Sequence, residues 1–128
     1  MEVIRSLDEF KPLKGSVLTI GSYDGIHRGH LEIISSIVHY GRARGLPSTL
    51  ITFEPHPRHI LERSNKKLPV LMRIEEKLDI IKKIGIEIVY VINFTEEFSK
   101  ITAIDFLDEI VVPFFNPQCI IVGYDHHF

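Results

Sequence analysis

Residues 21–30 constrain the fold of this chain more than any other stretch, because they join two segments of opposite periodicity. Before them, Ser16–Ile20 is a short, β-branched apolar run that ends at a glycine, as a buried strand does. After them, apolar residues recur at helical spacing from Leu31 to Val38. The stretch itself holds three glycines and two histidines. It therefore predicts a turn from a strand into a helix, at the strand end where open parallel sheets bind ligands.

The rest of the chain continues this alternation, after an irregular lead-in expected over residues 1–15. The further expected strands are Ser48–Phe53, Ile86–Ile92 and Cys119–Val122, and the expected helices are Gly29–Arg44, Ile74–Ile84 and a segment from Thr102 that stops before Pro113. Strands that alternate with helices form βαβ units around a parallel sheet, so the predicted fold class is α/β. The carboxyl ends of the strands are then expected along one edge, at Gly21, Phe53, Asn93 and Gly123.

Glycine, proline and capping residues set the expected ends of the helices. Gly45, followed closely by Pro47, is expected to end the first helix, and Gly85 the second. Thr102 forms a capping pair with the residue three positions later and opens the third helix. Pro113 is expected to stop that helix, because proline cannot continue a regular α-helix.

The composition is that of a soluble globular protein. The 128 residues fit one domain, with 45% hydrophobic and 25% charged residues. No apolar run reaches the roughly 20 residues that span a bilayer, and the N-terminus lacks a secretory pattern, so we expect a cytoplasmic protein without a membrane partner. A net charge of −2 favours a nucleotide over a nucleic acid as partner. The single cysteine, Cys119, is expected to pack as a small hydrophobic residue; no oligomeric state is indicated.

His27 and His30 are the candidate catalytic residues of the turn. They are three residues apart at the start of a helix, so both rings can face the same side. Imidazole N–H groups and the positive end of the helix dipole would stabilise negative charge on a pentacoordinate phosphorus and on a departing pyrophosphate. Gly29, between them, would let a phosphate approach the backbone.

Spacing alone leaves other interpretations of the histidines open. One of the two could cap the helix while the other is exposed. Zinc binding is less favoured, because the glutamate of a His-Glu-x-x-His motif is missing and no cysteine pair accompanies the histidines. Four further histidines form close pairs to which we assign no chemistry: His56 with His59, and His126 with His127.

Three stretches together resemble a known family. Residues 21–30 read Gly-x-Tyr-Asp-Gly-x-His-x-Gly-His and resemble the signature of the nucleotidylyltransferase superfamily that carries the His-x-Gly-His motif. Thr52–Arg58 and Val122–Phe128 are similar to the matching segments of bacterial FAD synthetase, the bifunctional riboflavin kinase/FMN adenylyltransferase family. Residues 75–77 and 94–98 add support in the same order. The resemblance covers almost the whole chain and implies a Rossmann-like, doubly wound parallel sheet.

The resemblance implies a reaction and a set of site residues. The reaction is transfer of AMP from ATP to FMN, with magnesium, to give FAD and pyrophosphate. His27 and His30 would hold the ATP phosphates and stabilise the transition state. The full set of nucleotide-binding residues would be Gly21, Ser22, Tyr23, Asp24, His27, Gly29, His30 and Asp125, with Asp125 also a candidate magnesium contact. The apolar slot for the flavin would comprise Phe53, Pro55, Pro57 and Phe128.

Several of these residues also fit a purely structural role. Phe53 and Phe128 could be ordinary core aromatics at strand ends. Asp125 could cap a turn. Asp24 is expected to stabilise its turn through its carboxylate rather than to act as a general base. Tyr23 and His126 stand where the family often has phenylalanine, and since both keep a ring we expect altered packing rather than lost function.

The end of the chain departs further from the family pattern. Family members continue through a glycine- and arginine-containing loop, a Ser/Thr-rich and arginine segment that contacts ATP, and a separate riboflavin kinase barrel. We therefore expect residues 1–128 to be an FMN adenylyltransferase domain that is incomplete at its C-terminus, with weak or no FAD synthesis alone. A cytidylyltransferase of the same superfamily and a non-catalytic nucleotide- or flavin-binding module are the alternatives.

Overall fold

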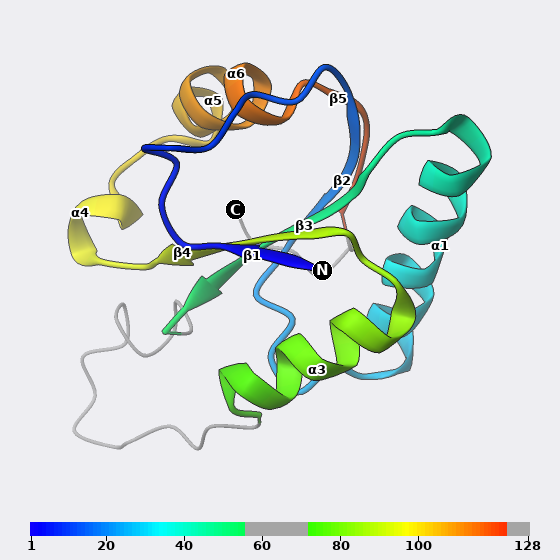
Figure 1. The fold of residues 1–128 in the computed structure, drawn as a ribbon. Coiled ribbons are helices and arrows are strands. Elements are labelled where there is room, and N and C mark those ends of the chain that lie inside the picture. The colour runs from blue at the N-terminus through cyan, green and yellow to red at the C-terminus, as the bar shows by residue number, and fades with distance from the viewer. Residues whose placement is uncertain (56–71, 123–128) are drawn as a thin grey trace.

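A five-stranded, all-parallel sheet forms the centre of the protein in the computed structural model, which describes residues 1–55 and 72–122 (Figure 1). Its strand order is β1-β4-β3-β2-β5. The strands are β1 (Glu2–Ile4), β2 (Ser16–Ile20), β3 (Ser48–Glu54), β4 (Ile88–Asn93) and β5 (Pro117–Ile121). The predicted α/β class is confirmed, and the four expected strands are present, Ser16–Ile20 with the expected ends and the other three with ends shifted by up to two residues.

Helices cover both faces of the sheet, as a doubly wound fold requires (Figure 1). One face carries α1 (Arg28–Arg44) and α3 (Ile74–Ile84). The other carries a run of short helical segments, namely α4 (Glu96–Ser99), α5 (Ala103–Phe106), η1 (Leu107–Val111) and α6 (Val112–Phe115). None of the helices in the described part of the chain is long and apolar enough to cross a membrane.

Two apolar clusters join these layers, because neighbouring residues of each strand point to opposite faces. Under α1 and α3, Ile34, Ile37 and Ile81 pack with Leu50 and Val89 of the strands. Cys119 packs against this cluster, as expected of a small hydrophobic residue. Leu18, Ile51, Phe106 and Phe115 belong to the cluster on the other face. Burial of both sheet faces explains why the strands read as continuous apolar runs rather than as alternating patterns.

The parallel register places the carboxyl ends of the central strands together. Ile20 pairs with Ile51, and Glu54 at the end of β3 pairs with Asn93 at the end of β4. The predicted common edge is therefore confirmed for the ends of β2, β3 and β4. Gly123, which was expected there too, lies outside the described residues.

Two expectations about secondary structure are wrong. The lead-in is not wholly irregular, since Glu2–Ile4 forms the edge strand β1 beside β4. A three-residue strand is too short to show any periodicity, and pairing with β4 defines it.

Pro113 also does not stop the third helix, because the backbone widens before it. Leu107–Val111 is a π-helical segment in which the Val112 N–H donates to the Leu107 carbonyl, and Pro113 lies in the first turn of α6. A proline lacks only its own N–H, and it is tolerated in a first turn, where that N–H has no helical partner. The glycine ends are confirmed, since Gly45 (φ 67°) and Gly85 (φ 116°) adopt left-handed conformations after α1 and α3.

Candidate nucleotide-binding site

The segment between β2 and α1 is anchored to the sheet by its first residues. The Gly21 N–H donates to the Ile51 carbonyl at 3.0 Å. Tyr23 is 4% exposed and has a φ of 49°, which is unusual for a bulky residue, and its hydroxyl is hydrogen-bonded to that of Thr19. A Cβ on Gly21 would lie 2.9 Å from Cε2 of the Tyr23 ring. Gly21 is therefore required by the packing of Tyr23, independently of any ligand.

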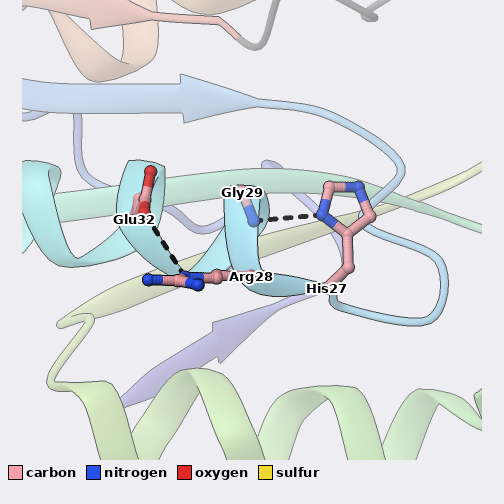
Figure 2. A network of polar contacts seen from close by, with 4 residues as sticks. All are labelled: His27, Arg28, Gly29 and Glu32. Atoms are coloured by element: carbon pink, nitrogen blue, oxygen red, sulfur yellow. Dashed lines mark hydrogen bonds and ion pairs between the residues drawn. The ribbon is translucent and has the colours of Figure 1, made fainter.

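The two histidines form a reciprocal cap at the start of α1. His27 is the N-cap residue, and its Nδ1 accepts from the Gly29 N–H at 3.1 Å (Figure 2). The His30 Nδ1 accepts from the His27 N–H at 3.3 Å. The rings are stacked, with centroids 3.6 Å apart and planes at 22°. The expectation that both rings face the same side of the turn is confirmed.

This cap also defines which ring nitrogen carries the proton. Because Nδ1 of each histidine accepts a hydrogen bond, the proton of each neutral ring is on Nε2. His27 and His30 therefore present two N–H donors of the same kind at the start of α1. The capping alternative is confirmed only in part, because both histidines take part in the cap and the exposed one is His27 itself. His30 is partly buried, and its ring lies against that of Tyr23 with centroids 5.0 Å apart.

Gly29 has a structural reason to lack a side chain, and its predicted role in nucleotide binding stays a prediction. A Cβ at this position would lie 3.1 Å from Cε1 and 3.3 Å from Nδ1 of His27. A side chain at this position would therefore crowd the His27 ring. The neighbouring Arg28 side chain reaches in the other direction, toward Glu32, at 3.9 Å (Figure 2). Both of these side chains are well exposed, so their ion pair contributes little to stability.

Lys77 is a buried residue beneath the turn to which the sequence analysis assigned no role. It is 5% exposed, and its Nζ donates to the Ser22 carbonyl at 2.8 Å and to the Thr52 hydroxyl at 3.0 Å. Burial lowers the pKa of the Lys77 ammonium to about 8, against the attraction of Glu54 and Asp24, which raises it. A signal was present in the sequence, because Lys77 lies three residues after Ile74 and four before Ile81, on the apolar stripe of α3.

The predicted flavin residues are only partly described. Phe53 is 4% exposed and packs at the end of β3 against Phe94 and Phe98, with centroids 5.7 and 6.1 Å away. Its core interpretation therefore holds, and its contact with flavin stays a prediction. Pro55 follows β3 and is half-buried. The remaining predicted residues lie outside the described residues, namely Pro57, Asp125, Phe128, His56, His59, His126 and His127.

Metal ligands do not gather in the part of the chain that the structure describes. Over residues 1–55 and 72–122, no three His, Cys, Asp or Glu side chains are grouped so that they could hold an ion. Asp24, one of the predicted nucleotide contacts, lies half-buried in the turn, where its charge acts on Lys77. Its position agrees with a role in holding the turn.

The pair formed by Thr19 and Tyr23 provides a test of how the turn is held. Thr19 is completely buried, and its hydroxyl is hydrogen-bonded to that of Tyr23. Tyr23→Phe would leave the Thr19 hydroxyl without this partner and lower the free energy of unfolding by about 1–2 kcal/mol. Adding Thr19→Val removes the orphaned hydroxyl, and the double variant should recover most of the loss. Urea denaturation of the four proteins measures this. Strictly additive losses would contradict the proposed coupling.

A parallel sheet whose first crossover begins with a histidine-capped turn defines the class of Rossmann-like nucleotidyltransferases. Within this class, residues 9–128 match the family model described as FAD synthetase. The chain belongs to the FAD synthetase family.

Curated relatives agree with this assignment. The bifunctional riboflavin kinase/FMN adenylyltransferase of Escherichia coli (strain K12) is 34% identical over 131 residues, which cover 100% of this chain and 41% of the relative. The Bacillus subtilis (strain 168) protein of the same name is 32% identical over 110 residues, covering 86% of this chain and 34% of the relative. The chain thus spans about two-fifths or less of these relatives' length.

The fold agrees with a solved structure as well. The crystal structure of a protein named macrolide-efflux protein from Streptococcus pneumoniae superposes with a TM-score of 0.79 at 27% identity. The match covers 99% of this chain and 43% of the other.

Proposed function

We propose that the protein transfers AMP from ATP to FMN, producing FAD and pyrophosphate. The observation that carries the proposal is the stacked pair of His27 and His30, which together cap the N-terminus of α1 through their Nδ1 atoms. The names of the relatives, which include FMN adenylyltransferase, supply the substrates. The proposed partners are thus small molecules, and a cytoplasmic location without nucleic acid or membrane partners remains a prediction from the sequence.

The chemistry follows from charge. A phosphate oxygen of FMN attacks the α-phosphorus of ATP, and the bond from that phosphorus to the oxygen bridging to the β-phosphate breaks. Negative charge develops on the α-phosphoryl oxygens and on the departing pyrophosphate. Neutral imidazoles that donate from Nε2, together with the positive end of the α1 dipole, stabilise this charge without a covalent intermediate. His27 and His30 are preorganised for this role by the backbone N–H groups that their Nδ1 atoms accept from.

We propose that ATP binds together with magnesium. Magnesium is usually held by one or two carboxylates together with nucleotide phosphates and waters, so it needs no three-ligand protein cluster. Asp125 is its proposed protein contact. The ion would neutralise phosphate charge when bound.

The flavin would lie near the end of β3, next to the turn. Phe53 is nearly covered by Phe94 and Phe98, so it could offer flavin only a small part of its ring. Pro55, which is half-buried, is the described residue better placed to form an apolar wall. We propose that Pro57 and Phe128 complete the slot, as the family resemblance implies.

The experiment is an assay of FAD formation by the full-length gene product. Incubation with FMN, ATP and magnesium should yield FAD, separated by chromatography and detected by fluorescence. A matched reaction with CTP is the control, since a preference for CTP would favour a cytidylyltransferase instead. Binding of FMN without any FAD formation by the full-length product would contradict the proposed activity and favour a binding module.

A further inference from the structure

We propose that Lys77 is a positioning residue, which holds the turn of residues 21–30 against the end of β3 so that His27 and His30 face the reacting phosphates. The inference rests on the proposed function for its kinetic consequence. Its structural part does not, because it concerns contacts within the ligand-free chain.

A closed hydrogen-bonded triangle links three elements at this point. The Lys77 Nζ, from the first half of α3, donates to both the Ser22 carbonyl and the Thr52 hydroxyl. The Thr52 hydroxyl, near the end of β3, donates to the same Ser22 carbonyl at 2.9 Å. One buried ammonium therefore connects a helix, a strand and the candidate site turn. Thr52 is completely buried and Lys77 nearly so, which makes the connection rigid.

The connection reaches the histidines through the backbone. Because a peptide unit is planar, fixing the Ser22 carbonyl also fixes the orientation of the Tyr23 N–H and constrains the following left-handed residue. A non-glycine residue with positive φ costs free energy and persists only where its surroundings define it. Tyr23 is held at its other end by Thr19, and its ring lies against that of His30 with the two planes at 75°. Lys77 thus acts on His30 through Ser22 and Tyr23, without touching it.

The energetics favour a functional reason for this lysine over a purely structural one. Burial lowers the pKa of Lys77 to about 8, so its surroundings, including Glu54 and Asp24, do not fully replace the water that the ammonium loses. An apolar side chain of similar length would fill the same space without that cost. The Thr52 hydroxyl would still donate to the Ser22 carbonyl. Packing of the fold therefore does not require a lysine at position 77. Orientation of the turn of residues 21–30 explains why one is present.

The primary test is Lys77→Met in the full-length gene product, with Lys83→Met as the matched control. Lys83 lies on the same helix, is exposed, and pairs only with Asp79 at the surface. We expect Lys77→Met to lower kcat for FAD formation by about 10- to 100-fold, as small misplacements of catalytic groups do. KM for FMN should change little. The Tm at pH 7 should be equal to or above that of the unsubstituted protein, and the control should match that protein in all respects.

Hydrogen exchange tests the same inference without depending on the reaction. In Lys77→Met the amides of residues 22–30 should exchange faster, while those of β3 and β4 should not. Thr52→Val is the second variant, and it should change the same amides in the same direction by a smaller factor. If no FAD is formed by the unsubstituted protein, the proposed function fails while faster exchange still supports positioning. Unchanged amide exchange in both variants would overturn the inference. A fall in Tm together with faster exchange of amides throughout the protein, rather than in residues 22–30 alone, would overturn it as well.

Discussion

Replacing His27 and His30 together by alanine is expected to lower the rate of FAD formation by at least about 100-fold, the loss typical of removing one preorganised transition-state donor. The double variant removes both Nε2–H donors, and what remains at the turn is the helix dipole and backbone amides. The expected loss is in kcat rather than in KM, because these donors act on charge that develops only in the transition state. Initial rates at saturating FMN and ATP measure it.

Capping has to be separated from catalysis in this experiment, since His27 does both. Loss of an N-cap side chain costs about 0.5–2 kcal/mol of stability, so the assays belong well below the Tm of each variant. Asparagine is a good N-cap residue, so the single variant His27→Asn should be more stable than His27→Ala. It lacks the imidazole, so its turnover should be as low as that of His27→Ala. His39→Ala is the matched control, because His39 is exposed on the same helix. Unchanged turnover in the double variant would contradict the roles assigned to both histidines.

The free energy of unfolding is expected to gain a contribution from Lys77 that grows between about pH 8 and pH 10.5. Burial lowers the pKa of this ammonium from 10.5 to about 8 in the folded protein. Between these values the unfolded chain binds more protons than the folded one, so stability rises with pH. The gap between the two pKa values corresponds to about 3 kcal/mol. Below pH 8 both states are protonated, and the folded protein carries the full cost of the buried charge.

Comparison with Lys77→Met isolates this contribution. Other groups titrate in the same window, among them Tyr90, whose pKa is raised by burial, but they act equally in both proteins. The measured quantity is the difference in free energy of unfolding between the two proteins, from urea denaturation at several pH values. At pH 7 the variant should be at least as stable as the unsubstituted protein, and its advantage should disappear by pH 10.5. Parallel pH curves would show that the buried ammonium carries no such cost.

Local chemistry and periodicity were sufficient for much of this protein. Alternating strand-like and helical segments predicted the parallel sheet and its common edge, because burying both faces of a strand demands continuous apolar runs. Gly45 and Gly85 were recognisable as helix ends, since glycine reaches the left-handed conformation without strain. Residues 21–30 identified the candidate site and, with two other stretches, the family, because the motif holds its chemistry within ten consecutive residues.

Tertiary structure decided what depends on partners distant in sequence. Glu2–Ile4 became a strand only because β4 is beside it. The position of Lys77 on the apolar stripe of α3 indicated that it is buried, but only the structure shows its hydrogen bond to Ser22, 55 positions away. Residues 21–30 by themselves determined that a histidine pair begins a helix after a strand. The surroundings of that pair depend on packing, because Ser22, Thr52 and Lys77 meet only when the sheet and α3 are assembled, and Tyr23, bonded to Thr19, lies against His30.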